Sequence, residues 1–202
     1  MSVISLEESR KKFVAEYLKQ TKSALEFIEN ELAAKIGKVT SILTNARDKG
    51  KKIFIMGNGG SASTASHFAN DLAKLTIADG YPRFKVISLT DNVPVMLAWA
   101  NDTAYENIFV EQLKNLMENE DIVIGISCSG NSMNVIKAVE YANSRNAITI
   151  GLSGFDGGKL LKTARENIHI PSFDMQKVED MHLLVQHILT TLIREEAMHN
   201  QR

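Results

Sequence analysis

The chain has 202 residues, of which 44% are hydrophobic and 23% charged, and 23 basic against 24 acidic residues give a net charge of −1. These values are typical of one globular α/β domain with a sizeable core, and the balanced charge argues against a protein that binds nucleic acid. The sequence has no apolar leader, no apolar run of about 18 residues and no second cysteine beside Cys128, so we expect a cytoplasmic protein without signal peptide, membrane span or disulfide.

The first predicted elements are helices. From Leu6 to Leu43, apolar residues recur at spacings of three, four and seven positions, which predicts two helices over residues 5–47 with a break near Gly37. An amphipathic stretch of this length must bury its apolar stripe. It could do so on its own sheet or on another subunit, and the sequence leaves both open.

After residue 49 the pattern alternates between short apolar runs and amphipathic segments. This alternation favours a parallel sheet with helices on both faces. We therefore predict a single domain, a three-layer α-β-α sandwich with a five-stranded parallel sheet, in which an N-terminal helical arm (1–48) precedes an α/β core (49–202). The predicted strands are 52–56, 84–89, 121–126, 147–152 and 167–170, and the predicted helices are 61–76, 92–100, 104–117, 133–145, 157–163 and 175–198.

A glycine-rich loop, Gly57-Asn58-Gly59-Gly60-Ser61, connects the first predicted strand to the next helix. Glycines let the backbone approach a ligand, and the amino-terminus of a helix attracts anions. The loop lacks the Gly-Lys-Ser/Thr ending of a P-loop, and Ala62 stands where a dinucleotide fingerprint has its third glycine. By itself, such a loop is better explained by a tight turn with a serine N-cap.

A serine-rich loop, Ser127-Cys128-Ser129-Gly130-Asn131-Ser132, follows the third predicted strand. Three hydroxyl groups within six residues suit the acceptor oxygens of a phosphomonoester, whereas helix capping needs only one of them. Both loops should lie at the carboxyl edge of the sheet, where such folds bind ligands. We therefore predict a phosphate-bearing ligand between the two loops.

Two helices carry side chains of metal-binding type. His67 and Asp71 are four residues apart and share one face of a helix. This face is opposite the expected core stripe Ala62, Ala65, Ala69, Leu72 and Ala73, so a solvated polar face is the simplest interpretation. The last helix adds Glu179, His182 and His187, whose spacing alone does not indicate a metal.

Both loops, together with Leu89–Asn92, Ala100–Asp102 and Gly154–Lys159, resemble the sugar isomerase (SIS) domain family. The resemblance extends from about residue 10 to 196, and within the family the chain is most similar to the phosphoheptose isomerases. It implies a flavodoxin-like SIS domain that isomerises sedoheptulose 7-phosphate to D-glycero-D-manno-heptose 7-phosphate through an enediol, supplying heptose for lipopolysaccharide. It also implies a homotetramer with active sites at subunit interfaces.

The resemblance assigns roles to individual residues. It implies one zinc ion held by His67, Asp71, Glu179 and His187, with Asp71 and His187 transferring the proton. Asp71 and Glu179 depart from the pattern, because the family has glutamate and glutamine at these positions. The residues expected to bind the substrate are Asn58, Gly59, Gly60, Ser61, Asn101, Asp102, Ser127, Cys128, Ser129, Ser132 and Glu179.

Helix geometry constrains this zinc site. Glu179 and His187 are eight residues apart, which is about 12 Å along a helix axis. One ion could bind both only if long side chains lean together, if the helix begins irregularly, or if two subunits contribute ligands.

Two other functions remain open. SIS domains also occur in non-catalytic proteins, either sugar-phosphate sensors or scaffolds of the kind that associates with the replication initiator. The departures at Asp71 and Glu179 leave room for an isomerase of another ketose phosphate. Retention of four metal-capable residues favours an enzyme.

Overall fold

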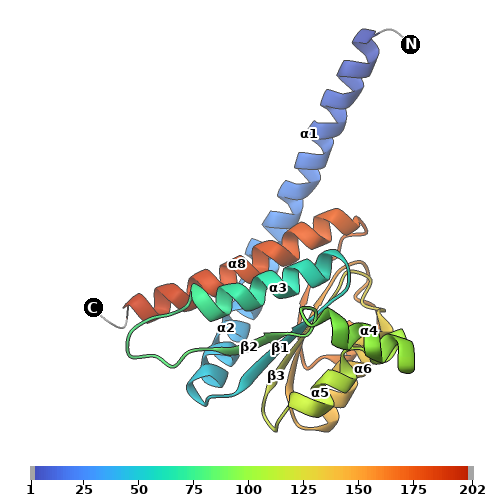
Figure 1. The fold of residues 1–202 in the computed structure, drawn as a ribbon. Coiled ribbons are helices and arrows are strands. Elements are labelled where there is room, and N and C mark those ends of the chain that lie inside the picture. The colour runs from blue at the N-terminus through green and yellow to red at the C-terminus, as the bar shows by residue number, and fades with distance from the viewer. Residues whose placement is uncertain (1–2, 200–202) are drawn as a thin grey trace.

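The computed structural model describes residues 3–199, and the side chains of residues 5–199. Its centre is a five-stranded, all-parallel sheet with the strand order β2-β1-β3-β4-β5 (Figure 1). The strands are β1 (Lys52–Met56), β2 (Lys85–Ser88), β3 (Ile122–Ser127), β4 (Ile148–Ser153) and β5 (Glu166–His169). All five predicted strands are confirmed, with ends shifted by at most one residue.

Helices cover both faces of the sheet because alternate strand residues point to opposite faces. Ile53 and Ile55 belong to one core cluster, with side chains of α2 (Ala33–Asp48), α3 (Gly60–Lys74) and α8 (Met175–His199). Phe54 and Met56 belong to a second cluster with side chains of α5 (Val110–Leu116), α6 (Met133–Ser144) and α7 (Gly158–Thr163). The predicted three-layer sandwich is confirmed.

The predicted helix at 104–117 is not continuous. It consists of a 3₁₀ turn, η2 (Tyr105–Asn107), and the separate helix α5. Ile108 and Phe109, between the two, are almost fully buried in the second core cluster. Upstream of η2, helix α4 (Val93–Asp102) has no buried residue.

The N-terminal segment begins with α1 (Val3–Phe27), a long helix that extends away from the rest of the molecule (Figure 1). The predicted break near Gly37 is wrong. The irregularity is a π-helical turn, η1 (Ile28–Leu32), and Gly37 lies inside α2. Of the predicted arm, residues 28–46 contribute core side chains such as Ile36 and Leu43, whereas Phe13 and Leu18 of α1 are exposed.

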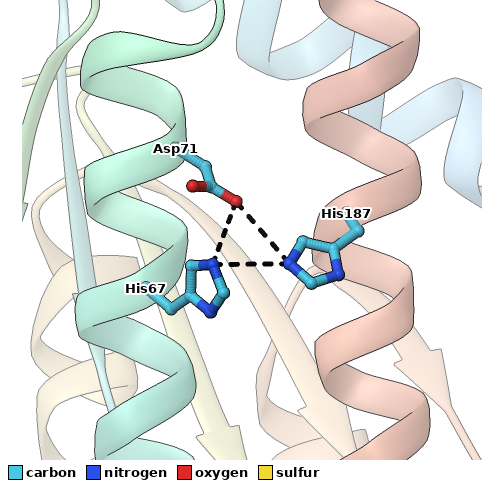
Figure 2. A group of neighbouring side chains, drawn as sticks. All are labelled: His67, Asp71 and His187. Carbon is cyan, nitrogen blue, oxygen red and sulfur yellow. Dashed lines mark hydrogen bonds and ion pairs between the residues drawn. The ribbon is translucent and has the colours of Figure 1, made fainter.

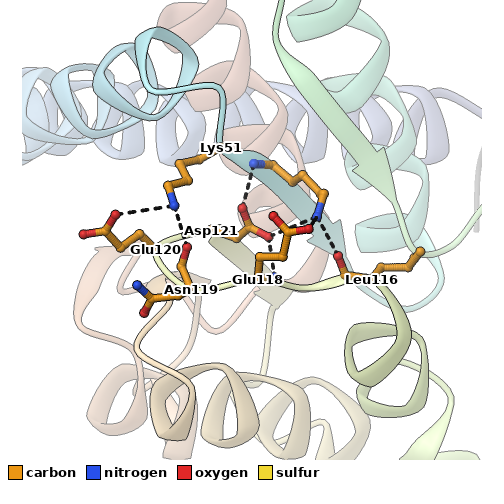
Figure 3. Close-up of polar contacts among 7 residues, drawn as sticks. Lys51, Leu116, Glu118, Asn119, Glu120 and Asp121 are labelled. Carbon is orange, nitrogen blue, oxygen red and sulfur yellow. Dashed lines mark hydrogen bonds and ion pairs between the residues drawn. The ribbon is translucent and has the colours of Figure 1, made fainter.

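A network of hydrogen bonds and ion pairs lies at the amino-terminal edge of the sheet (Figure 3). Asp121 is 1% exposed. Its two carboxylate oxygens accept hydrogen bonds from the backbone N–H groups of Lys52 (2.8 Å) and Glu118 (2.7 Å). The ammonium group of Lys52 pairs with Glu118 at 2.9 Å, and this pairing lowers the pKa of Glu118. The network joins the start of β1 to the loop before β3, at the end of the strands away from the glycine and serine loops.

Across residues 3–199, no helix has the length and apolar character that a membrane crossing requires.

Candidate functional site

The glycine loop and the serine loop meet at the carboxyl edge of the sheet, because β1 and β3 are neighbours. Ser61 Oγ lies 3.8 Å from Cys128 Sγ. The Asn58 amide exchanges hydrogen bonds of 3.0 and 2.8 Å with Asn134, and the Tyr105 hydroxyl donates to Asn58 Oδ1 at 2.9 Å. Asn134 and Tyr105 are not among the site residues predicted from the sequence. Asn134 carried a signal, since it stands two residues after the serine loop, where α6 begins.

The hydroxyl groups of the serine loop are not used for helix capping. Ser132 is the N-cap residue of α6, yet its side chain caps no backbone N–H group. Instead, its Oγ lies 2.9 Å from Ser127 Oγ, while Ser129 Oγ accepts a bond from the backbone N–H of Asn131 at 3.2 Å. The loop therefore holds grouped hydroxyls beside a helix amino-terminus, an arrangement that suits a phosphate group.

The amino-terminus of α3 is equally free of a side-chain cap. The helix starts after Gly59, whose φ of +53° favours glycine, and no side chain caps this end. The first N–H groups of a helix have no partner within the helix, so they are available to an anion. A cavity of about 240 Å³ adjoins this loop and is lined by Gly57, Asn58 and Gly59 together with residues of α4 and η2.

Cys128 lies between these hydroxyls as a buried free thiol. Burial raises the pKa of the Cys128 thiol, so the group is neutral at pH 7. A neutral buried thiol is a poor nucleophile, and its contact with Ser61 is a hydrogen bond between the two side chains.

Three metal-capable side chains converge between α3 and α8 (Figure 2). Asp71 Oδ2 lies 3.4 Å from His67 Nε2 and 3.7 Å from His187 Nε2, and the two Nε2 atoms are 3.4 Å apart. The histidines are 120 residues apart in the chain. The packing of α8 against α3 brings them together.

The expectation that the face of α3 with His67 and Asp71 is solvated is wrong at Asp71. Asp71 is 3% exposed, whereas His67 beside it on the helix is exposed. The buried stripe of α3 also differs from the predicted one: it includes Ser61, Thr64 and Phe68, whereas Ala73 is exposed. The face of α3 that carries Asp71 lies against α8, so a polar side chain is enclosed between the two helices.

The environment of Asp71 fits a cation. Its Oδ1 accepts a hydrogen bond from Asn70 at 3.2 Å, but its Oδ2 is buried and has no hydrogen-bond donor among the described residues. The separations from the two histidines are those of an ion pair and too long for good hydrogen bonds. A carboxylate oxygen and two imidazole nitrogens converging on one point form a ligand set typical of zinc.

Glu179 is not a member of this group. Its carboxylate packs instead on Gly60, the first residue of α3: a β-carbon on Gly60 would overlap Glu179 Oε1 and lie 2.5 Å from Cδ and Oε2. The negative charge of Glu179 also contributes to the raised pKa of Cys128. The structure therefore places Glu179 with the two loops and not with the three convergent ligands.

The remaining predicted residues lie elsewhere. Asn101 and Asp102 are exposed at the end of α4 and hydrogen-bond to each other at 2.8 Å, without a recorded contact to either loop. His182 is buried at 1% exposure, where its Nε2 lies 3.2 Å from the Ser153 carbonyl oxygen. Burial lowers the pKa of His182 to about 4, so it is neutral and serves the packing of α8.

Comparison with known proteins identifies the family of the chain. The SIS domain family model matches residues 16–154. A phosphoheptose isomerase from Geobacter metallireducens is 34% identical over 185 residues, covering 88% of this chain and 94% of that protein. One from Helicobacter pylori is 38% identical over 192 residues, covering 94% and 96%.

Among solved structures, the phosphoheptose isomerase from Neisseria gonorrhoeae superimposes with a TM-score of 0.85 at 28% identity, covering 92% of this chain and 98% of that one. These matches span nearly the whole length of both proteins, and the solved structure has the same fold. The chain therefore belongs to the SIS domain family, as an enzyme of the phosphoheptose isomerase type.

Proposed function

We propose that this protein isomerises sedoheptulose 7-phosphate to D-glycero-D-manno-heptose 7-phosphate with the help of a bound zinc ion. The observation that carries the proposal is the convergence of His67, Asp71 and His187 between α3 and α8. The relatives named phosphoheptose isomerase support the choice of substrate class.

The serine loop is proposed to hold the phosphate. Ser127, Ser129 and Ser132 present hydroxyl groups beside the start of α6, and each can donate to a phosphate oxygen. His67 lies seven residues into α3 from Gly60, which is about 10 Å along the helix. This separation between the loops and the metal-capable group suits an open-chain sugar whose carbonyl end is distant from its phosphate.

The proton transfer is proposed for Asp71 and His187. An aldose–ketose isomerase takes a proton from the carbon beside the carbonyl and returns it to the former carbonyl carbon. A second group protonates the carbonyl oxygen and takes the proton of the neighbouring hydroxyl, which becomes the new carbonyl. Asp71 Oδ2 and His187 Nε2 are 3.7 Å apart, so both can face one substrate. Zinc, when bound, supplies polarisation of the carbonyl and charge stabilisation in the enediol. The family resemblance implies that Glu179 is a fourth zinc ligand. To bind the ion, its carboxylate would have to move away from Gly60.

A homotetramer is also part of the proposal. Apolar side chains of α1, among them Phe13, Val14 and Leu18, are exposed along a helix that stands away from the sheet. A second copy would bury this stripe, and the exposed side of the site between α3 and α8 could then be completed by a neighbouring subunit.

A proton NMR time course with sedoheptulose 7-phosphate in deuterated water tests the proposal. Zinc-loaded protein should produce an aldose with solvent deuterium at C2, and chelator or the His187→Ala variant should abolish both product and exchange. Absence of product and exchange with every metal ion tested would refute the proposed activity. Pentose and hexose phosphates assayed in parallel distinguish a heptose isomerase from one acting on another ketose phosphate.

A further inference from the structure

Asn134 ties the glycine loop to the helix that follows the serine loop. It is the second residue of α6 and is 2% exposed. Its side-chain amide forms a closed pair with the amide of Asn58: Asn58 Nδ2 donates to Asn134 Oδ1 at 3.0 Å, and Asn134 Nδ2 donates to Asn58 Oδ1 at 2.8 Å. A buried side chain from one loop region therefore holds a ligand-facing residue of the other.

Neighbouring groups fix the orientation of both amides. The backbone N–H of Val135 can only donate, and it bonds to Asn134 Oδ1 at 3.0 Å, so the oxygen of Asn134 lies on that side. The nitrogen of Asn134 is then left to face the oxygen of Asn58, which also accepts the Tyr105 hydroxyl at 2.9 Å. Both acceptor positions of Asn58 Oδ1 are therefore occupied within the protein.

The Asn58 amide keeps one donor for a ligand. It has two N–H groups, and only one of them has an acceptor among residues 5–199. Asn58 is half-buried and lines, together with Tyr105, the cavity of about 240 Å³ beside the glycine loop. A donor that is already held in one orientation suits an acceptor oxygen of a ligand, because binding then loses little side-chain entropy.

We propose that Asn134 and Tyr105 are positioning residues for sugar-phosphate binding, which hold the Asn58 amide so that its free N–H donates to the ligand. This inference rests on the proposed binding of a sugar phosphate between the loops. Neither residue belongs to the three convergent side chains of α3 and α8 to which proton transfer is assigned. Loss of either should therefore raise KM and leave kcat nearly unchanged.

The test is a double-mutant cycle with sedoheptulose 7-phosphate. KM and kcat are measured on zinc-loaded protein, and the affinity is measured by isothermal titration calorimetry with chelator present. The variants are Asn134→Ala and Tyr105→Phe, each made in the wild type and in Asn58→Ala. Asn143→Ala is the matched control, because it removes side-chain hydrogen bonds with Thr149 and Thr163 at the other end of α6. Thermal denaturation shows whether each variant folds.

Asn58→Ala and Asn134→Ala should each weaken the affinity by about tenfold, which corresponds to one hydrogen bond. KM should rise by a similar factor while kcat stays within about threefold of wild type. Tyr105→Phe should weaken the affinity by about threefold, because the amide pair remains. In the Asn58→Ala background, neither substitution should cause a further loss, because both residues act through Asn58. Asn143→Ala should bind and react as wild type does.

Additive losses in the Asn58→Ala background would overturn the inference, because the residues would then act independently of Asn58. Unchanged affinity in Asn134→Ala, or a fall in kcat without a rise in KM, would also overturn it. If Asn134→Ala does not fold, the Tyr105→Phe pair decides by the same criterion. If wild type isomerises the sugar phosphate in these cases, only the inference has failed. If wild type neither binds nor isomerises it, the proposed function has failed and the inference with it.

Discussion

His182 should make this protein lose stability in mild acid. The cause is the burial of its side chain, which the Glu–x–x–His pattern around it does not indicate. The side chain is 1% exposed and its Nε2 lies 3.2 Å from the Ser153 carbonyl oxygen. A carbonyl oxygen only accepts hydrogen bonds, so Nε2 carries the proton of the neutral ring. Nδ1 is buried without a partner, and protonating it would leave a charged N–H group with no acceptor among the described residues.

The magnitude follows from the two pKa values. Burial lowers the pKa of His182 from its ordinary 6.5 to about 4 in the folded chain. Below pH 6.5 the unfolded chain binds a proton that the folded chain rejects, so stability is complete above pH 6.5 and is lost as the pH falls toward 4. At up to 1.4 kcal/mol per pH unit, this amounts to about 2 kcal/mol between pH 7 and pH 5.

Urea denaturation of wild type and His182→Gln at pH 7, 6 and 5, followed by circular dichroism at one protein concentration, measures the effect. Other groups titrate in both proteins, so the difference between the two pH profiles isolates His182. The free energy of unfolding of wild type should fall by about 2 kcal/mol more than that of the variant over this range. His199→Gln, which removes an exposed histidine from the same helix, should behave as wild type. Parallel profiles for wild type and His182→Gln would refute the argument that His182 is forced to be neutral.

Three further predictions concern the metal group, the sheet edge and the serine loop. Asp71→Ala should lower zinc affinity by about 100-fold or more, because it removes the one carboxylate of the group. A competition titration with a chromophoric chelator measures the affinity, and a near-normal value would show that Asp71 is not a ligand. Asp121→Ala should lower the free energy of unfolding, measured by urea denaturation, by about 2–4 kcal/mol, because two backbone N–H groups lose their acceptor. A loss below about 1 kcal/mol would contradict this prediction. Gly130→Ala should destabilise the protein and weaken phosphate binding, since the φ of Gly130 is +64° and a β-carbon there would overlap the Gly157 carbonyl oxygen. An unchanged melting temperature and an unchanged phosphate affinity, both measured by calorimetry, would show that the loop accommodates the β-carbon.

Local sequence was sufficient for the sheet and for both loops. Runs such as Ile122–Ile126 are apolar at every position, which is typical of a strand buried on both faces. The placement of the loops then follows, because the ends of parallel strands share one edge of the sheet. The segments that deviated were those in which long-range packing outweighs local preference. The helix predicted at 104–117 is interrupted at Ile108 and Phe109, which lie in the second core cluster. The irregularity in the N-terminal helices falls at Ile28–Leu32, where the chain meets the core.

The candidate site also has features that local sequence determines and features that long-range packing determines. The sequence alone determined that His67 and Asp71 share a helix face, because a spacing of four residues ensures it. Only the tertiary structure decided that this face is enclosed by α8, that His187 joins the pair from 120 residues away, and that Glu179 rests on Gly60. Periodicity specifies which side chains share a face of one helix. The partner of that face is set by the packing of helices far apart in the chain. This packing places the carboxylate of Asp71 beside His67 and His187, and that of Glu179 at the start of α3.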